Sequence, residues 1–314
     1  MQKVSIIIPV HNEEGNIFPM IQTLIRIFDS LPYSHEIIFV NDGSTDNTAE
    51  VLKSASLEYN IFYIELSRNF GHQNALKAGL DHVNGECTIS LDGDFQHPPS
   101  LIPKLLQKWE EGYEIVYTKR RDFKDTPRFK RFTSRLFYKI INKLSDIKIE
   151  EGSADFRLMD SKVIQAMKEM PENDLFIRGL VKWIGFKQYG IEYNPDQRFS
   201  GKSKYTITRM IKFAVQGISA FSIRPLYAAI FIGLFFSVLS LFAFIPYVII
   251  SLMNETAVSG WASIITTIVF FGGLNLTTLG VIGIYVGKVF MQSKSRPNYF
   301  VRETNIIKYD TAKF

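Results

Sequence analysis

Two carboxylates flank one glycine in the segment Asp92-Gly93-Asp94, and an amide side chain, Gln96, follows shortly after. Carboxylate and amide oxygens are ligands that Mg²⁺ and Mn²⁺ accept in proteins. A divalent metal held there would bridge the phosphates of a nucleoside diphosphate and stabilise it as a leaving group. The same pattern is also typical of a plain turn. Its position directly after the apolar run 87–91 favours a metal site made of Asp92, Asp94 and Gln96.

Polar residues follow three other apolar runs in the same way. These clusters are residues 9–14 (PVHNEE), 41–44 (NDGS) and 67–72 (SRNFGH). Because Asp, Asn and Gly are ordinary loop residues, any one cluster alone could be a simple turn. Four such clusters at four strand ends instead predict that acidic and amide groups converge on one edge of a sheet, as a polar ligand requires.

The elements that would position these clusters alternate between strands and helices. Short apolar strands are predicted at residues 4–9, 36–41, 61–66, 87–91 and 114–118. A helix is predicted over residues 45–58 with Ser44 as its N-cap, and another begins at Pro98 and Pro99. This alternation predicts an α/β fold with a doubly wound, mainly parallel sheet.

Several other protein classes lack support in the sequence. There is no G-x-G-x-x-G after the first strand and no G-x-x-x-x-G-K-[ST], which argues against dinucleotide oxidoreductases and P-loop NTPases. H-E-x-x-H and G-x-S-x-G are also missing. The single Cys87 cannot form an intrachain disulfide, which suits a reducing compartment. Residues 1–9 do not read as a secretory signal.

Two long runs near the C-terminus, residues 226–252 and 257–287, contain no charged residue. Each exceeds the ~20 residues that a helix needs to cross a bilayer. Buried helices of a soluble core are the alternative, but such helices usually keep a polar stripe. Lys and Arg flank both runs and are absent from residues 253–256, so both termini are predicted to be cytoplasmic, with a short external turn.

The predicted organisation has four parts. They are a cytoplasmic catalytic domain (1–204), a juxtamembrane amphipathic helix (205–224), two transmembrane helices (225–290) and a cytoplasmic tail (291–314). In residues 127–144, apolar residues recur at steps of three and four, and basic residues, including Arg135, recur on another face. This is the pattern of a helix that lies on anionic lipid. Ordinary surface helices packed on the core are the alternative for both amphipathic segments. The net charge of +5 is compatible with either.

The motifs together resemble those of a known family. The segments are IIIPVHNEE, NDGSTDNT, LSRNFGHQNA, LDGDFQHPP, GSADFRLMD and FSGKSKY. They resemble family 2 glycosyltransferases with a GT-A fold, and most closely the polyprenyl-phosphate branch, which includes dolichyl-phosphate mannose synthases and bactoprenol glucosyltransferases. The resemblance covers nearly the whole chain, including both apolar runs.

The resemblance implies a role for each matching residue. A nucleotide-sugar donor would be bound by Pro9, His11, Glu13, Asp42, Arg68 and Asp92. Asp92, Asp94 and Gln96 would hold Mg²⁺ or Mn²⁺, and Asp94, Asp155 and Arg157 would be catalytic. The phosphate of the acceptor would be bound by Arg135, Arg198, Lys202, Ser203 and Lys204. Asp155 would be either a general base or a positioning group.

The expected reaction is an inverting sugar transfer from the nucleotide to a polyprenyl phosphate in a bacterial plasma membrane. UDP-glucose with undecaprenyl phosphate is the leading pair. UDP-N-acetylglucosamine, GDP-mannose or an aminoarabinose nucleotide are alternative donors, and a processive synthase or a non-catalytic membrane scaffold are alternative functions. No nucleic acid partner is expected. Small-residue spacings such as Gly283-x-x-x-Gly287 would suit contacts between the spans or within a homo-oligomer.

Overall fold

The computed structural model describes residues 1–120, 142, 152–172, 175–193, 222–253 and 261–306. An eight-stranded sheet lies at the centre of the α/β part of the molecule, in the order β7-β5-β6-β4-β1-β2-β3-β8. Its strands are β1 (Lys3–Val10), β2 (Ser34–Asn41), β3 (Ile61–Leu66), β4 (Cys87–Ser90), β5 (Ile115–Arg120), β6 (Ser153–Asp160), β7 (Gln188–Tyr193) and β8 (Val301–Thr304).

Each of the five strands predicted from the sequence is present. β1 pairs in parallel with β2 and β4, and β2 pairs in parallel with β3. β6 runs antiparallel to both β4 and β5, and β8 runs antiparallel to β3. The predicted parallel arrangement therefore holds at the centre of the sheet, whereas the whole sheet is mixed.

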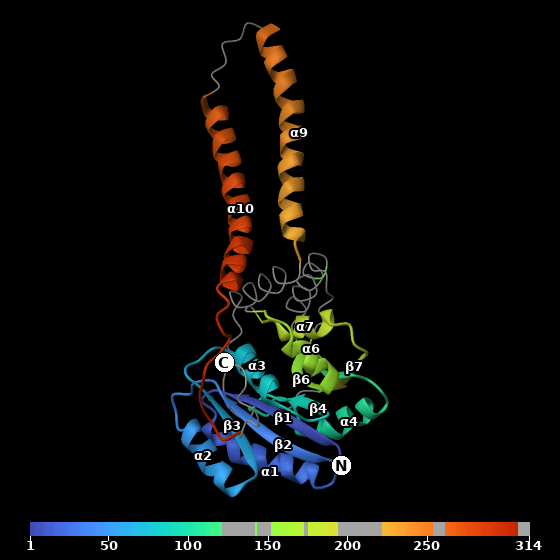
Figure 1. Cartoon of the computed structure of the whole chain (residues 1–314). Coiled ribbons are helices and arrows are strands. Elements are labelled where there is room, and N and C mark those ends of the chain that lie inside the picture. Colours follow the sequence, from blue (N-terminus) through green and yellow to red (C-terminus); the bar gives the residue numbers. More distant parts are fainter. Residues whose placement is uncertain (121–141, 143–151, 173–174, 194–221, 254–260, 307–314) are drawn as a thin grey trace, which may run out of the picture.

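Helices cover both faces of the sheet (Figure 1). The helices of this part are α1 (Ile17–Phe28), α2 (Thr48–Glu58), α3 (His72–His82), α4 (Ile102–Glu110), α6 (Ser161–Lys168) and α7 (Ile177–Trp183), with short 3-10 turns η1 (Glu14–Asn16) and η2 (Pro99–Leu101). One apolar core joins the sheet to α1, α2 and α4. A second core joins the opposite face to α3, α6 and α7. Because side chains alternate along a strand, Ile6 and Ile8 enter the first core while Ile7 enters the second.

The helix over residues 45–58 begins three residues later than predicted, and Ser44 is not its N-cap. The Ser44 hydroxyl donates a 2.6 Å hydrogen bond to Asn41 Oδ1 instead. α2 starts at Thr48, whose amide donates to Asp46 Oδ1 at 3.1 Å. The N-cap position belongs to Asn47, whose side chain makes no capping hydrogen bond, and the Asp46 carboxylate accepts from the first turn in its place.

Two long helices project from this part of the molecule and lie side by side (Figure 1). They are α9 (Arg224–Met253) and α10 (Trp261–Ser293). Among the described residues, Phe270–Ser293 is the one stretch long and apolar enough to cross a membrane, and the apolar stretch Arg224–Phe236 in α9 is shorter. One predicted span thus meets the length and composition test, and the second stays a prediction. The predicted external turn falls mostly in 254–260, outside the described residues.

Candidate active site

The polar clusters predicted at the strand ends do meet at one edge of the sheet. β1, β2, β3 and β4 are parallel neighbours, so their carboxyl ends lie together. β6 runs the opposite way beside β4, with Ser90 opposite Arg157. The beginning of β6 therefore lies beside the end of β4, which brings Asp155 close to Asp92. The Ser90 hydroxyl ties the two strands by donating to the Asp155 carbonyl at 2.5 Å.

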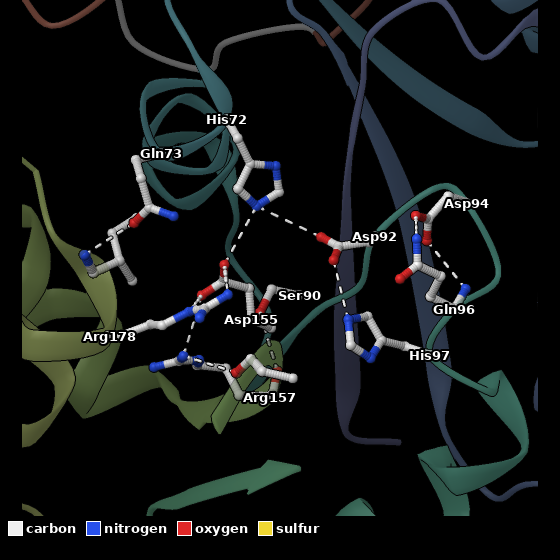
Figure 2. A network of polar contacts seen from close by, with 12 residues as sticks. His72, Gln73, Ser90, Asp92, Asp94, Gln96, His97, Asp155, Arg157 and Arg178 are labelled. Atoms are coloured by element: carbon white, nitrogen blue, oxygen red, sulfur yellow. Dashed lines mark hydrogen bonds and ion pairs between the residues drawn. The ribbon is translucent and has the colours of Figure 1, made fainter. Parts of the chain in front are cut away.

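Asp92 lies between two imidazoles (Figure 2). Its Oδ2 is 3.1 Å from His97 Nε2, and its Oδ1 is 3.5 Å from His72 Nε2. The other ring nitrogen of His97 is 2.6 Å from the Tyr193 hydroxyl. Burial alone would raise the pKa of Asp92, but the His97 hydrogen bond and the charge of His72 outweigh it and lower that pKa. Asp92 is therefore held as a carboxylate.

Asp155 is the most strongly held carboxylate of the site. Arg178 donates to both of its oxygens in a bidentate pair, with Nε and Nη2 each at 2.8 Å. Arg157 Nη2 lies 3.3 Å from Oδ1 on the inner side. Asp155 is 5% exposed. Burial works against its charge, but Arg178 and the other cationic groups hold the pKa of Asp155 well below its usual range.

His72, the first residue of α3, joins the two carboxylates. Its Nε2 is 3.6 Å from Asp155 Oδ2 as well as 3.5 Å from Asp92. Burial disfavours the imidazolium, but the hydrogen bond to Asp155 and the charge of Asp92 raise the pKa of His72 to about 9. The ring is then a cation at neutral pH. It connects the carboxylate after β4 to the carboxylate on β6 (Figure 2).

Arg157 lies beneath Asp155 rather than in the open part of the site. The residue is 2% exposed, and its Nη2 donates to the Ala154 carbonyl at 2.9 Å. No partner for its Nε is present among the described residues. Burial, only partly offset by Asp155, lowers the pKa of Arg157 to about 10. This placement fits a group that positions Asp155.

Asp94 and Gln96 form a local pair beside Asp92. The Gln96 backbone amide donates to Asp94 Oδ1 at 3.0 Å, and its side-chain amide donates to Oδ2 at 2.5 Å. Glu13 is close enough to interact with Asp94. Burial raises the pKa of Glu13, and the Asp94 charge raises it further. This part of the edge therefore carries concentrated negative charge.

The oxygen ligands that follow β4 fit a hard divalent cation that also binds a substrate. The described residues contain no group of three His, Cys, Asp or Glu side chains placed to hold a metal by themselves. Mg²⁺, however, is commonly held by only one or two carboxylates together with substrate phosphates. Asp92 and Asp94, with only Gly93 between them in the chain, supply two carboxylates after β4. Gln96 lies against Asp94, where it orients that carboxylate.

The predicted nucleotide-binding residues surround the ends of β1 and β2. Pro9 lies in β1 opposite Val40. His11 Nδ1 is 3.0 Å from the Asp42 carbonyl oxygen. The Asp42 carboxylate accepts from the amides of Phe70 and Gly71 at 2.7 and 2.9 Å, and burial raises the pKa of Asp42. Asp42 thus fixes residues 67–71, which we call the β3–α3 loop.

Arg68 projects from the β3–α3 loop. It is exposed, with its guanidinium 4.1 Å from the centroid of the Phe70 ring.

The predicted acceptor residues cannot be placed in the same way. Arg135, Arg198, Lys202, Ser203 and Lys204 lie outside the described residues, as do the amphipathic stretch 205–221 and nearly all of 127–144.

Sequence reasoning did not assign roles to His72, His97 or Arg178. His72 and His97 belong to the segments LSRNFGHQNA and LDGDFQHPP that carried the resemblance, so the motifs pointed to their location. Arg178 belongs to no such segment. It reaches Asp155 because α7 begins beside α3, where the Ile177 amide donates to Gln73 Oε1 at 3.0 Å.

The sheet, the carboxylates at its edge and the family comparison define a glycosyltransferase. A model of glycosyl transferase family 2 matches residues 5–167. The chain belongs to this family, and the mixed α/β sheet supports the GT-A fold expected from the sequence.

Relatives match over nearly the whole chain. An uncharacterized glycosyltransferase, YkcC of Bacillus subtilis, is 40% identical over 96% of this chain and 93% of its own length. The bactoprenol glucosyl transferase of Shigella phage SfX is 38% identical over 96% of this chain and 99% of its own. Among solved structures, the mannosyltransferase PcManGT from Pyrobaculum calidifontis has a TM-score of 0.48 at 16% identity, covering 70% of this chain and 63% of that one.

Proposed function

We propose that this enzyme transfers a hexose, with inversion, from a nucleotide-sugar to a polyprenyl phosphate. UDP-glucose and undecaprenyl phosphate are the preferred donor and acceptor. The observation that carries the proposal is the pairing of Asp92 with the Asp155–Arg178 ion pair through His72. Asp92, which suits a metal-bound diphosphate, thus lies beside the cationic groups of His72 and Arg178, which suit a second phosphate. The name of the bactoprenol relative supports the same acceptor.

The chemistry asks little of a general base. A phosphate monoester has a second pKa of about 6, so the acceptor is already largely ionised at neutral pH. The enzyme's main task is to hold two anions close together and in line. Mg²⁺ or Mn²⁺, held by Asp92 and Asp94, would supply charge stabilisation for the leaving diphosphate.

The residues of the chain then divide the remaining work. His72 carries positive charge between the two carboxylates, and Arg178 adds positive charge beside Asp155, so both reduce the repulsion between the two phosphates. Arg157 and Arg178 fix the orientation of Asp155 from two sides. Arg198, Lys202, Ser203 and Lys204 are proposed to contact the acceptor phosphate, and Arg135 is proposed to lie at the lipid surface.

A substrate panel tests this proposal. The purified, detergent-solubilised enzyme should be incubated with undecaprenyl phosphate and, in turn, UDP-glucose, UDP-N-acetylglucosamine, GDP-mannose and an aminoarabinose nucleotide. We expect one sugar to appear on the lipid, with UDP-glucose giving the highest rate. A lipid that carries two or more sugars in sequence would instead favour a processive synthase. A protein that transfers none of them would favour a non-catalytic scaffold.

The proposed setting is a bacterial plasma membrane crossed twice, by α9 and α10, with the catalytic domain and both termini in the cytoplasm. The exposed apolar side chains of α10 support membrane insertion, among them Leu276, Leu279 and Val286. A homo-oligomer is compatible with the glycines of α10 that face open space, such as Gly280 and Gly287.

Reporter fusions check this topology. A reporter joined after Phe314 is expected to be active on the cytoplasmic side, and one inserted at Asn254 on the external side, because basic residues flank both helices and are absent between them. A fusion after residue 222, upstream of α9, is the matched cytoplasmic control. A C-terminal reporter found outside would mean that one of the two helices does not cross.

A further inference from the structure

The chain continues past the membrane helix and returns to the catalytic sheet. We call residues 298–306 the C-terminal strap. At the end of α10, Gln292 Nε2 donates to the Pro171 carbonyl at 2.6 Å, and Asn298 Nδ2 donates to the Glu172 carbonyl at 2.9 Å. The Tyr299 hydroxyl then lies 3.0 Å from Asp81 on α3. The path from α10 to the sheet is therefore fixed at successive points.

β8, within the strap, closes the edge of the sheet beside β3. Glu303 accepts from Lys53 Nζ at 2.7 Å and from the Tyr63 hydroxyl at 2.8 Å. Asn305 accepts from the Tyr63 amide at 2.8 Å and donates to the Ile61 carbonyl at 3.1 Å. These bonds anchor the far half of the strap on β3 and α2.

The near half of the strap holds the β3–α3 loop instead. The Ser67 amide donates to the Phe300 carbonyl at 2.9 Å. Arg302 Nη2 donates to the Ser67 carbonyl at 2.7 Å, and its Nη1 donates to Glu65 Oε1 at 3.0 Å. The rings of Phe300 and Phe70 pack with their centroids 6.4 Å apart. Strap and loop are thus joined by backbone, ionic and aromatic contacts.

The opposite side of the same loop faces the proposed donor subsite. Asp42 accepts the amides of Phe70 and Gly71, and Asn69 Nδ2 is 3.2 Å from His11 Nδ1. Gly43 fits against the loop so closely that a Cβ there would lie 2.4 Å from the Arg68 carbonyl carbon. The loop ends at Gly71 and is followed directly by His72, which contacts both Asp92 and Asp155. A displacement of the loop would therefore alter both subsites.

We propose that the C-terminal strap is a positioning element of the nucleotide-binding site, with Phe300 and Arg302 as its positioning residues. This proposal rests on the proposed function, because it assumes that His11 and Asp42 face the nucleotide. The strap holds the outer side of the β3–α3 loop while Asp42 holds the inner side. The chain segment that follows α10 therefore helps to shape the donor site.

The experiment measures nucleotide affinity and the two kinetic constants in the full-length protein. Phe300→Ala and Arg302→Gln are titrated with UDP and with GDP in the presence of Mg²⁺, beside the wild type. We expect each variant to bind the preferred nucleotide about tenfold more weakly, which is ~1.4 kcal/mol. The KM for the nucleotide-sugar should rise by a similar factor and the KM for the lipid should not. Phe300→Tyr, which keeps the ring, should restore the affinity.

Glu303→Gln is the matched control, because its carboxylate bonds to Lys53 and Tyr63 and not to the loop. It should keep the nucleotide affinity of the wild type. The Arg302 side chain is 60% exposed, so its replacement leaves no cavity, and thermal melting monitors folding in every variant. Unchanged affinity in both Phe300→Ala and Arg302→Gln would overturn the strap proposal while the function stands. A wild type that binds neither UDP nor GDP would instead remove the proposed function itself.

Discussion

Replacing Asp94 by Asn is expected to lower kcat by ~10²–10³-fold while the protein stays folded. Asp94 supplies one of two carboxylates beside the proposed diphosphate position, and its negative charge is what a divalent cation needs there. Several kcal/mol of charge stabilisation would be lost, and each ~1.4 kcal/mol is a tenfold change in rate. The measurement is the rate of sugar transfer at saturating Mg²⁺ or Mn²⁺, with thermal melting as the check on folding.

Metal removal provides the companion test. Activity should vanish in excess chelator and return on addition of Mg²⁺ or Mn²⁺. Asp29→Asn is the matched control for Asp94→Asn, because Asp29 is an exposed carboxylate at the end of α1, away from the site. With metal present, Asp29→Asn should retain the wild-type rate. Full turnover in chelator would show that Asp92 and Asp94 serve another purpose than metal binding.

Replacing Asp155 by Asn is expected to lower kcat by ~10²-fold or more, with no narrowing of this deficit at any pH above ~7. The variant removes the carboxylate that Arg157 and Arg178 both contact, and so reduces the negative charge that balances these cations in a buried place. A carboxyl whose pKa is held well below its usual range is ionised throughout this pH interval and is a weak proton acceptor. The acceptor phosphate, with a second pKa of about 6, ionises without help.

The pH–rate profiles of Asp155→Asn and wild type, measured side by side between pH 6 and 9, separate the two roles. If Asp155 positions the cationic groups, the deficit of the variant does not shrink above ~7. It widens where His72 loses its proton earlier in the variant, because Asp155 helps to raise the pKa of His72. If it were the general base, the deficit of the variant would shrink as rising pH ionises the acceptor. A deficit that closes steeply between pH 6 and 8 would restore Asp155 as the base.

The strands at the centre of the sheet could be predicted because they are continuously apolar. Buried parallel strands such as β1 and β2 contact helices on both faces, so nearly every position is hydrophobic. β6 gave no comparable pattern, since it contains Asp155 and Arg157 among its buried residues. These two charges are tolerated inside because they pair with each other and with Arg178.

The site likewise contains some residues that the sequence predicts and others that it does not. Asp92, Asp94 and the strand-end clusters were visible because they follow apolar runs in the sequence. Arg178 was not, because its ion pair with Asp155 spans 23 residues and depends on the placement of α7. The strap was not foreseen either, and residues 291–314 were predicted as a plain tail. The strand in it is short and mostly exposed, and only its contacts with β3 distinguish it from a tail.

Sugar transfer to the lipid is tested by measuring the release of UDP from UDP-glucose with and without undecaprenyl phosphate, combined with mass analysis of the lipid. We expect fast release of UDP that depends on the lipid, one hexose on each product molecule, and loss of both signals in Asp94→Asn. Release of UDP at the same rate without the lipid, with free glucose as the product, would contradict sugar transfer to the lipid.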